Sequence, residues 1–341
     1  MKFLRIAFVY NVRHQYPDPN DLRGQEETDF DDPATIETMA GHLRACGYEV
    51  LPIEADENCY GELLRNRDRI DLVFNYAEGR HGLDRECHVP AMLEMLRIPY
   101  TGSAPLAQAL VLNKAKTKDV LRAHGVPVLP HCVLHSAAEA SSVALEYPLI
   151  VKPLAQGSSA GITNDSVVRT PEELARQAAR VLEGLGSAVM VEPFVSGREF
   201  SVAMLGNPPQ VLPPIEPNHK RLPAGYEKID SLEVKWILEE SAGMEDYLLC
   251  PAPMDGDLLA RVEGICRDTW AALGIRDLCR VDIRCDRQGR PYVLEVNSPA
   301  GLLPPEISQS SYFPLAARTA GIGYRDLLRR IVECAWARLH P

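Results

Sequence analysis

Four polar residues alternate with apolar ones near the end of the chain, in CRVDIRCDRQGRPYVLEVNSPAG. Arg280 and Asp282 lie two apart before the DRQG turn, and Glu295 and Asn297 lie two apart after it. Because residues i and i+2 of a strand point to the same face, a hairpin closed by this turn gathers the four side chains on one face. Two carboxylates and an amide oxygen are ligands that Mg²⁺ prefers, usually shared with substrate phosphates. The alternative is a solvated face of paired charges, which half-buried strand pairs commonly carry.

The same alternation predicts a register for this hairpin. Closing the chain at DRQG places Cys285 opposite Arg290 and Arg280 opposite Glu295. The other face then carries an apolar stripe suited to a core, formed by Val281, Ile283, Tyr292, Leu294 and Val296.

A second group of polar residues follows an apolar strand, in VKPLAQGSSAGI. Lys152 ends the strand, and a lysine in that position needs an anionic partner. The loop then turns through Gly157, Ser158 and Ser159, and such a loop can aim N–H groups and hydroxyls at phosphate oxygens. It is not a Walker A loop, because no GK[S/T] follows. A plain turn between two strands is the alternative, and Lys152 weakens it.

Three further charged residues are weaker candidates when each is taken alone. Lys114, in LNKAKTK, is compatible with a solvated lysine on a helix face. Glu192 and Glu199 flank PFVSGR, where they are either surface charges or acceptors for an adenine amino group and ribose hydroxyls.

The elements before these residues predict a small parallel α/β domain over residues 1–103. LRIAFVY, YEVLPI and IDLVFNYA have the apolar, β-branched character of strands, and HVPAMLEMLRI that of a helix. Another helix begins at Asp32 as its cap, with Pro33 in its first position, and ends at Gly47. The strand–helix–strand order favours a parallel sheet, and the missing GxGxxG argues against a dinucleotide fold.

The pattern changes from Ala104 onward. LAQALVLNKAKTKDVLRAHG predicts one helix, and AVMVEPFVSGREFSVAML predicts two strands. TPEELARQAARVLEGLG predicts a helix that Thr170 caps, Glu173 completes as a capping box and Gly184 ends. Residues 214–250 are rich in charge, glycine and proline, and a stretch of this length without an obvious core role predicts a mobile lid. DGDLLARVEGICRDTWAALGI and GYRDLLRRIVECAWARL predict two more helices.

Composition excludes several classes of protein. The 341 residues are 46% hydrophobic and 24% charged, which fits a globular protein of two or three domains. A formal charge of −11 argues against a broad nucleic-acid or anionic-membrane surface. Nine cysteines without a CxxC pair favour reduced thiols and a cytoplasmic location. The first apolar run is too short for a membrane span and has no signal-cleavage pattern.

Taken together, IPYTGS, VKP…GSSAGI, VEPFVSGREF and LEVNSPAG resemble the D-alanine–D-alanine ligase family of the ATP-grasp superfamily. The resemblance covers most of the chain and is strongest over residues 98–205 and 279–330. It implies an N-terminal parallel α/β domain, 1–103, followed by an ATP-grasp fold of two α+β lobes, 104–196 and 197–341. The last lobe carries the metal site and the lid.

The resemblance also implies a role for each candidate residue. The expected ATP-binding residues are Lys114, Lys152, Ser158, Ser159, Glu192, Pro193, Phe194, Val195 and Glu199. Among them, Glu192 and the 193–195 backbone would hold adenine, and Glu199 the ribose. The expected ligands of two Mg²⁺ ions, or of Mn²⁺ in their place, are Asp282, Glu295 and Asn297. Arg280 and the Gly301 N–H would stabilise a tetrahedral oxyanion, and Lys235 would reach the γ-phosphate.

The activity implied is the ATP-dependent joining of a carboxylate to an amine through an acyl-phosphate. Its partners are small amino-acid or carboxylate substrates and neither nucleic acid nor a membrane, with a homodimer as an alternative to a monomer. Two other functions stay open: a D-alanine–D-alanine ligase of cell-wall synthesis, and a nucleotide-binding module that has lost its chemistry and acts through a partner.

The amino-acid half of the chain departs from the family pattern. The family's glutamate just after the first strand, which holds the first substrate's ammonium, has no counterpart in register in VYNVRHQYPDPND. FNYAEGRHGLDRE replaces the family's LHGxxGEDG, and Trp236 stands where a tyrosine is common. Glu78, His81 and Arg85 are either substitute recognition groups or ordinary loop residues, and Ser311 is a candidate for the second substrate's carboxylate. We therefore expect D-alanine to be a poor first substrate.

Overall fold

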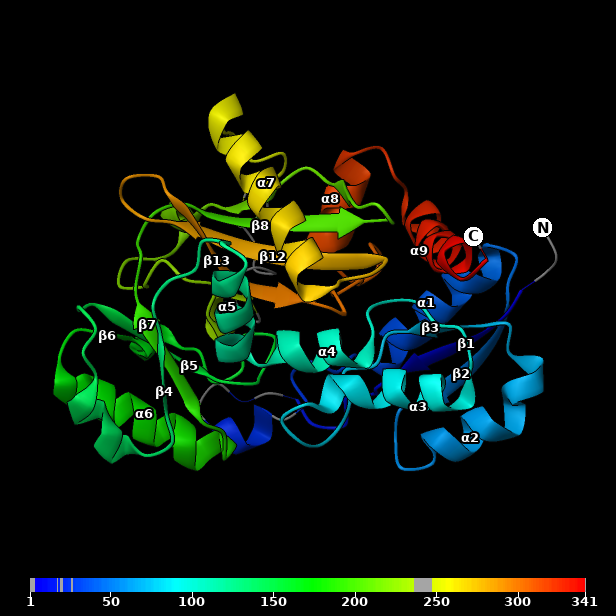
Figure 1. The fold of residues 1–341 in the computed structure, drawn as a ribbon, viewed down its shortest axis with the longest axis horizontal. Helices are drawn as coiled ribbons and strands as arrows, with labels where there is room; N and C mark the ends of the chain where they lie inside the picture. The colour runs from blue at the N-terminus through cyan, green and yellow to red at the C-terminus, as the bar shows by residue number, and fades with distance from the viewer. Residues whose placement is uncertain (1–3, 17, 19–20, 26, 236–246, 341) are drawn as a thin grey trace.

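The computed structural model describes residues 4–16, 18, 21–25, 27–235 and 247–340. Within these ranges the chain forms three main sheets flanked by helices (Figure 1). The N-terminal sheet lies at the right of Figure 1, the sheet of β4 to β7 at the lower left, and the sheet containing β8, β12 and β13 above the space between them. This mixture of one parallel and two antiparallel sheets confirms the predicted fold class.

The N-terminal sheet is parallel, with strand order β2-β1-β3. Its strands are β1 (Arg5–Tyr10), β2 (Glu49–Glu54) and β3 (Leu72–Asn75). The helices of this part are α1 (Pro33–Ala45), α2 (Cys59–Asn66) and α3 (His88–Leu96). Since parallel strands end at the same edge, the loops after β1 and β3 emerge side by side.

The C-terminal helices complete the core of the N-terminal sheet. In α1, Ile36, Met39 and Leu43 are buried at the spacing of one helix face, as predicted. They share one apolar cluster with residues of α8 (Tyr312–Thr319) and α9 (Tyr324–Leu339). The two ends of the chain are therefore packed together, and α9 lies beside α1 (Figure 1).

The second sheet is antiparallel, with strand order β4-β7-β5-β6. Its strands are β4 (Cys132–Leu134), β5 (Leu149–Pro153), β6 (Val167–Val168) and β7 (Val189–Pro193). Helix α6 (Pro171–Leu185) buries its apolar side against this sheet. Short 3-10 helices occur at Leu22–Gln25, Arg67–Arg69, Arg85–Cys87, Ala137–Ser142, Asn164–Ser166 and His219–Arg221.

The ends of α6 differ in detail from the prediction. The Thr170 side chain accepts a hydrogen bond from the Glu173 N–H, which confirms the cap. The Glu173 carboxylate, however, accepts a hydrogen bond from the Arg169 N–H at 2.6 Å. It therefore bonds to the residue before the cap and not to Thr170 itself. The helix ends two residues later than predicted, at Gly186, whose φ of +59° suits glycine.

The helix predicted over LAQALVLNKAKTKDVLRAHG is in fact two helices, α4 (Pro105–Leu112) and α5 (Lys114–Ala123). Asn113 separates them with an extended ψ of 94°, and its side chain caps α5 by accepting from the Lys116 N–H at 3.1 Å. The Lys114 N–H donates to the Leu154 carbonyl at 3.1 Å, just beyond β5. This break allows α5 to begin against the sheet that carries Lys152.

The third sheet is antiparallel, with strand order β13-β12-β8-β9. Its strands are β8 (Glu199–Leu205), β9 (Gln210–Val211), β12 (Leu278–Cys285) and β13 (Pro291–Asn297). Helix α7 (Gly256–Leu273) covers one face, and residues of α4 and α5 enter the same apolar cluster. The opposite face of β8, β12 and β13 is turned toward the second sheet (Figure 1).

The register of the β12–β13 hairpin differs from the prediction. Arg280 lies opposite Asn297, Asp282 opposite Glu295, and Cys285 opposite Pro291. A bulge on β13 between these pairings shifts the strand by one residue. Val293 therefore takes the core position that was predicted for Tyr292 and Leu294, which are only half-buried. The shared polar face survives, because its four residues all lie on the same side of the bulge, before it on β12 and after it on β13.

The stretch 214–250 contributes more to the core than its composition predicted. It contains the short strands β10 (Glu216–Pro217) and β11 (Leu248–Leu249), and it buries Ile229, Leu232 and Tyr247. Residues 236–246, and with them Trp236, lie outside the described ranges. Across the described part of the chain, every helix is too short or too polar to cross a membrane.

Candidate active site

The polar face of the hairpin is one connected set of charges. Arg280 donates from Nε and Nη2 to the two carboxylate oxygens of Asp282, at 3.1 and 3.0 Å. The Ser201 hydroxyl and the Asn297 amide also donate to Asp282, at 2.6 and 2.9 Å. Burial lowers the pKa of Arg280, but Asp282 and Glu295 outweigh this effect and raise it above its ordinary value. The guanidinium is a permanent cation beside the metal candidates.

Glu295 is held as an anion by the cations around it. Burial alone would raise the pKa of Glu295, but Lys114, Lys235 and Lys152 lower it to about 2. The Lys114 ammonium lies 3.6 Å from the Glu295 carboxylate. Two carboxylates and one amide on a single face suit Mg²⁺, which commonly takes one or two carboxylates and completes its shell with water and phosphates. Among the described residues, no group of three or more His, Cys, Asp or Glu side chains is arranged so that it could hold a metal ion by itself.

A buried ion network surrounds Lys152, the lysine predicted to bind phosphate. Lys152 on β5 contacts one carboxylate oxygen of Glu192 at 2.8 Å, and Lys118 on α5 contacts the other at 3.0 Å. Glu192 is fully buried; burial raises its pKa, but the two lysines lower it to about 2. Lys118 also donates to the Val293 carbonyl at 2.9 Å, which ties α5 to β13. The sequence prediction missed Lys118, although it lies one helical turn after Lys114.

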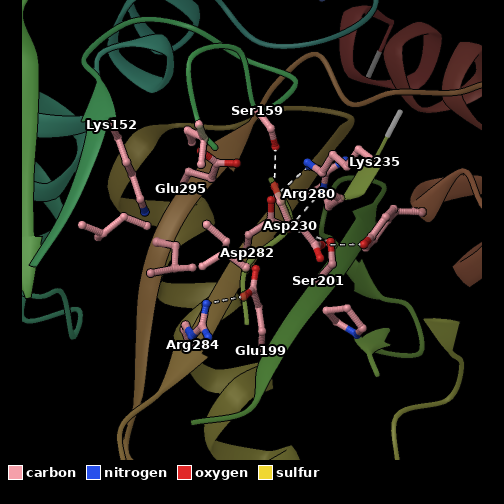
Figure 2. A pocket seen from close by; sticks show the side chains of 16 residues that line it. Lys152, Ser159, Glu199, Ser201, Asp230, Lys235, Arg280, Asp282, Arg284 and Glu295 are labelled. Atoms are coloured by element: carbon pink, nitrogen blue, oxygen red, sulfur yellow. Dashed lines mark hydrogen bonds and ion pairs between the residues drawn. The ribbon is translucent and has the colours of Figure 1, made fainter. Parts of the chain in front are cut away.

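A small cavity of about 60 Å³ lies between the second and third sheets. Figure 2 shows Lys152 on one side of it and Arg280, Asp282 and Glu295 on the other. Its apolar lining is Ile150, Ile162, Ile229 and Leu294, and its polar lining includes Lys152, Ser159, Glu199, Asp230, Lys235 and Arg284. An apolar slot that ends in cations has the chemistry expected of a site for a nucleotide base and its phosphates.

The predicted adenine residues do not line this cavity. Glu192 is occupied by its two lysines, and Pro193 and Phe194 line a separate surface hollow. The Phe194 N–H donates to the Pro148 carbonyl at 2.8 Å and so is not available to a base. Val195 lines neither of the cavities of the site. The β5–β7 pairing turns Glu192 into the sheet interior, toward Lys118 and Lys152. The adenine role of these residues stays a prediction.

Glu199, the predicted ribose residue, does line the cavity but has a protein partner. The Arg284 guanidinium donates to its carboxylate at 2.8 Å (Figure 2). The same guanidinium lies 4.9 Å above the Phe194 ring. Burial raises the pKa of Glu199, and Arg284 opposes that effect. Arg284 was missed from the sequence; it lies two residues after Asp282 on the same face, which was the available signal.

A larger cavity of about 260 Å³ adjoins the small one. The two share Lys235, Arg280, Glu295 and Tyr312 in their linings. Of the predicted residues, the larger cavity is lined by Lys114, Ser158, Gly301, Ser311, Glu78 and Asn297. Ser158 and Ser159 have φ values of +46° and +59°, which are strained for non-glycine residues, and they lie one in each cavity.

Comparison with known proteins agrees with this geometry. The family model described as D-ala D-ala ligase C-terminus matches residues 120–333. The chain belongs to the D-alanine–D-alanine ligase family. It is 34% identical over 312 residues to a D-alanine–D-alanine ligase of Pelotomaculum thermopropionicum, covering 88% of this chain and 91% of the relative. An uncharacterized protein of Sinorhizobium fredii, y4sG, is 35% identical over 309 residues, with coverage of 89% and 87%.

A solved structure shows the same fold. The D-alanine–D-alanine ligase from Bacillus anthracis, crystallised with ATP, superposes with a TM-score of 0.71 and 24% sequence identity. The superposition covers 98% of each chain. These matches confirm the family resemblance and the ATP-grasp fold that the motifs predicted.

The part of the larger cavity near the N-terminal sheet differs from the sequence prediction. We expected no glutamate in register after the first strand and named Glu78 as a candidate substitute. Glu78 does line the larger cavity, together with Asp29, Asp31 and Glu86, which were not predicted. The two aspartates come from the loop before α1, after the stretch VYNVRHQYPDPND in which the family's glutamate was sought. Loops that follow parallel strands converge at one edge of the sheet, and this rule was the signal that could have found them.

The other predicted substrate residues are divided by the structure. His81 is exposed and does not line the cavity. Arg85 is buried, donates to Asp29 at 2.8 Å and to the Ala155 carbonyl at 3.0 Å, and acts as a support for the loop. Ser311 lines the cavity. Its contact with a substrate carboxylate stays a prediction.

Asp230, which the sequence prediction missed, joins the lid to the rest of the ligase fold. Its carboxylate accepts from Tyr247 at 2.7 Å and from Tyr312 at 2.8 Å, and it lies 3.3 Å from His219. Its backbone carbonyl accepts from the Ser159 hydroxyl at 2.7 Å (Figure 2). Burial raises the pKa of Asp230, but these partners and Lys235 outweigh it and keep the pKa below its ordinary value. One residue thus connects the Gly/Ser loop through its backbone carbonyl, and the lid and α8 through its carboxylate.

Proposed function

We propose that this protein is an ATP-dependent ligase that joins the carboxylate of one amino-acid-like substrate to the amine of another. The observation that carries the proposal is that the two cavities meet at one polar face, where Arg280, Glu295 and Lys235 line both of them. A nucleotide bound between the second and third sheets with its phosphates at the small cavity, and an amino acid in the larger cavity, would then have their reacting groups at the same place. The intact set of charges on this face argues against a binding module without chemistry.

The first step we propose is phosphoryl transfer. A substrate carboxylate oxygen attacks the γ-phosphorus, the bond to the bridging oxygen breaks, and ADP leaves with the electron pair. Lys114, Lys152 and Lys235 surround the place where charge develops, and positioning with charge stabilisation supplies most of the catalysis of such transfers. Two Mg²⁺ ions, or Mn²⁺ in their place, held by Asp282, Glu295 and Asn297 would neutralise phosphate charge.

The second step is amide formation. A neutral amine nitrogen attacks the acyl carbon, and the resulting oxyanion accepts hydrogen bonds from the Arg280 guanidinium and the Gly301 N–H. The carbon–oxygen bond to phosphate then breaks, phosphate leaves, and the nitrogen loses its extra proton to solvent. The contacts of Asp230 with Ser159 and Tyr247 would hold the lid closed, so that water does not hydrolyse the acyl-phosphate.

The physiological setting is also part of the proposal. All nine cysteines are free thiols, which supports a reducing compartment such as the cytoplasm. The relatives named D-alanine–D-alanine ligases make D-alanyl-D-alanine synthesis the second candidate.

A panel assay tests the proposal. The purified protein is incubated with MgATP and single or paired amino acids of both hands, and ADP and amide products are quantified. We expect ADP formation that depends on an amino acid and yields an amide. ATP turnover that no amino acid stimulates would refute the ligase proposal, whereas efficient synthesis of D-alanyl-D-alanine alone would favour the second candidate.

A further inference from the structure

At the end near the N-terminal sheet, the larger cavity is lined by more carboxylates than the ammonium group of an ordinary amino acid can contact. Asp29, Asp31, Glu78 and Glu86 line that end. A single α-ammonium forms its strong contacts with one or two carboxylates, so the surplus requires another explanation. Buried carboxylates are normally paired with a cation, because an unpaired buried charge is costly.

One of the four is already paired within the protein. Asp29 forms a salt bridge with Arg85 at 2.8 Å, and both side chains are almost fully buried. The loop of Gly157 packs directly on Asp29, since a Cβ at that glycine would lie 2.5 Å from its carboxylate. Asp29 therefore supports the loops and is not available to a ligand.

A second carboxylate is placed for the α-ammonium. The Tyr76 hydroxyl hydrogen-bonds to Asp31 and accepts from the Leu302 N–H at 3.3 Å. Leu302 directly follows Gly301, whose N–H we assign to the oxyanion. The Tyr76 side chain thus links Asp31 to the part of the cavity beside Gly301. The α-carbon of an acyl donor must lie there, because its carboxylate reacts at that place.

Glu78 and Glu86 have no such assignment. Neither forms an ion pair with any residue in the described part of the chain, and one oxygen of Glu86 has no hydrogen-bond partner there. Glu86 is 9% exposed and belongs to the cavity lining. Burial raises the pKa of Glu86 to about 8, and burial together with Glu86 raises that of Glu78 well above its ordinary value. Arg85 and Lys114 oppose this rise at Glu86, and Arg85 opposes it at Glu78, but neither cation forms an ion pair with these acids. Two neighbouring acids that line the cavity and have no ion pair among the described residues have the chemistry that would hold a second ammonium.

We propose that the acyl donor is a diamino acid, whose α-ammonium lies at Asp31 and whose side-chain ammonium is held by Glu78 and Glu86. This inference rests on the proposed ligase function. The cavity of about 260 Å³ is several times the roughly 30 Å³ that one water occupies in the liquid, so a chain longer than a methyl group fits. Lys114, Lys235 and Arg280 from other elements line the same cavity, and they would draw the donor's carboxylate toward the nucleotide.

The test compares each diamino acid with the neutral acid of the same chain length. The probes are lysine against norleucine and ornithine against norvaline, in both D and L forms, with D-alanine as the amine partner. ADP formation gives kcat/KM, and calorimetry with a non-hydrolysable ATP analogue gives the dissociation constant without turnover. We expect at least a tenfold preference for the diamino acid of the better pair, since a charge-assisted hydrogen bond changes affinity by roughly ten- to a hundredfold.

Variants assign the preference to these residues. Glu86→Gln should bring the ratio of diamino to neutral acid close to one, and Glu78→Gln repeats the test if the first variant does not fold. Asp84→Asn is the matched control, because Asp84 is an exposed acid of the same loop that does not line the cavity. The control should keep the full ratio.

The outcomes separate this inference from the proposed function. Equal or tighter binding of the neutral acids, together with normal ADP formation, overturns the diamino-acid inference alone. Preferential binding of a diamino acid without any ADP formation supports the site and refutes the ligase function. If no amino acid binds and none is turned over, both are wrong.

Discussion

Replacing Lys118 with methionine should destabilise the protein strongly, although Lys118 lines neither cavity. Glu192 is fully buried, and its pKa of about 2 lies below its ordinary 4.5, mainly because Lys118 and Lys152 outweigh the effect of burial. That difference corresponds to roughly 3 kcal/mol, since one pKa unit is about 1.4 kcal/mol. Removing one partner from a buried ion pair costs about 3–5 kcal/mol when nothing replaces it. Because Lys152 stays, we expect Lys118→Met to lower the free energy of unfolding by about 2–4 kcal/mol.

Urea denaturation measures this loss, with Lys116→Met as the matched control. Lys116 is an exposed lysine of the same helix, two residues away, so its replacement changes net charge equally without touching Glu192. The control should unfold at nearly the wild-type urea concentration. If Lys118→Met unfolds together with Lys116→Met, the reasoning about the buried network is refuted.

The same network has a pH dependence of known sign. Because folding lowers the pKa of Glu192, its stabilising contribution is fully present above the unfolded value near 4.5 and is lost as pH falls toward 2. The double variant Lys118→Met with Glu192→Gln removes the buried carboxylate as well, so it should recover a large part of the stability. It should also flatten the acid limb of the profile.

Four further predictions concern the site. Asp282→Asn should reduce ADP formation at least about a hundredfold at saturating Mg²⁺ with little change in melting temperature, because it removes a metal ligand from a cavity wall and no core group; near-normal turnover would contradict the metal assignment. Lys152→Ala should weaken binding of MgATP in calorimetry by at least about tenfold, and unchanged affinity would contradict its phosphate role. Asp230→Asn should raise the ratio of phosphate released to amide formed, because its lid contacts weaken; an unchanged ratio would exclude a role in lid closure. Affinity for the acyl donor should rise as pH passes about 6, where the half-buried Asp31 ionises, and Asp31→Asn should abolish that rise in a binding titration.

Local patterns were sufficient for the parts of the site that lie on one or two consecutive elements. The i and i+2 spacing of Arg280 and Asp282 fixed their common face, and the turn brought Glu295 to the same side. The exact register was not predictable, because the bulge on β13 inserts one residue that no turn signal marks. The parallel order of the N-terminal sheet followed from the alternation of strands and helices.

Contacts between segments that are distant along the chain could not be predicted from local sequence patterns. The pairing of β5 with β7 turns Glu192 toward Lys118 and Lys152, and no spacing along the chain reveals which face of β7 is interior. The break at Asn113 was hidden for a related reason, since its flanks both have helical character and only the cap geometry separates them. Asp31 lines the cavity because the path of its loop is set by the edge of the sheet. Looking for a carboxylate only at the family's position just after the first strand therefore missed it.

The central claim is that a substrate carboxylate is activated by phosphorylation. It is tested most directly by supplying an acyl donor labelled with ¹⁸O in its carboxylate, together with MgATP and an amine partner, and analysing the released phosphate by mass spectrometry. An acyl-phosphate carries one carboxylate oxygen in its bridge to phosphorus, and attack on the acyl carbon leaves that oxygen with the phosphate. The account predicts one ¹⁸O atom in each phosphate formed together with amide. Phosphate that carries only unlabelled oxygen while amide accumulates would contradict it.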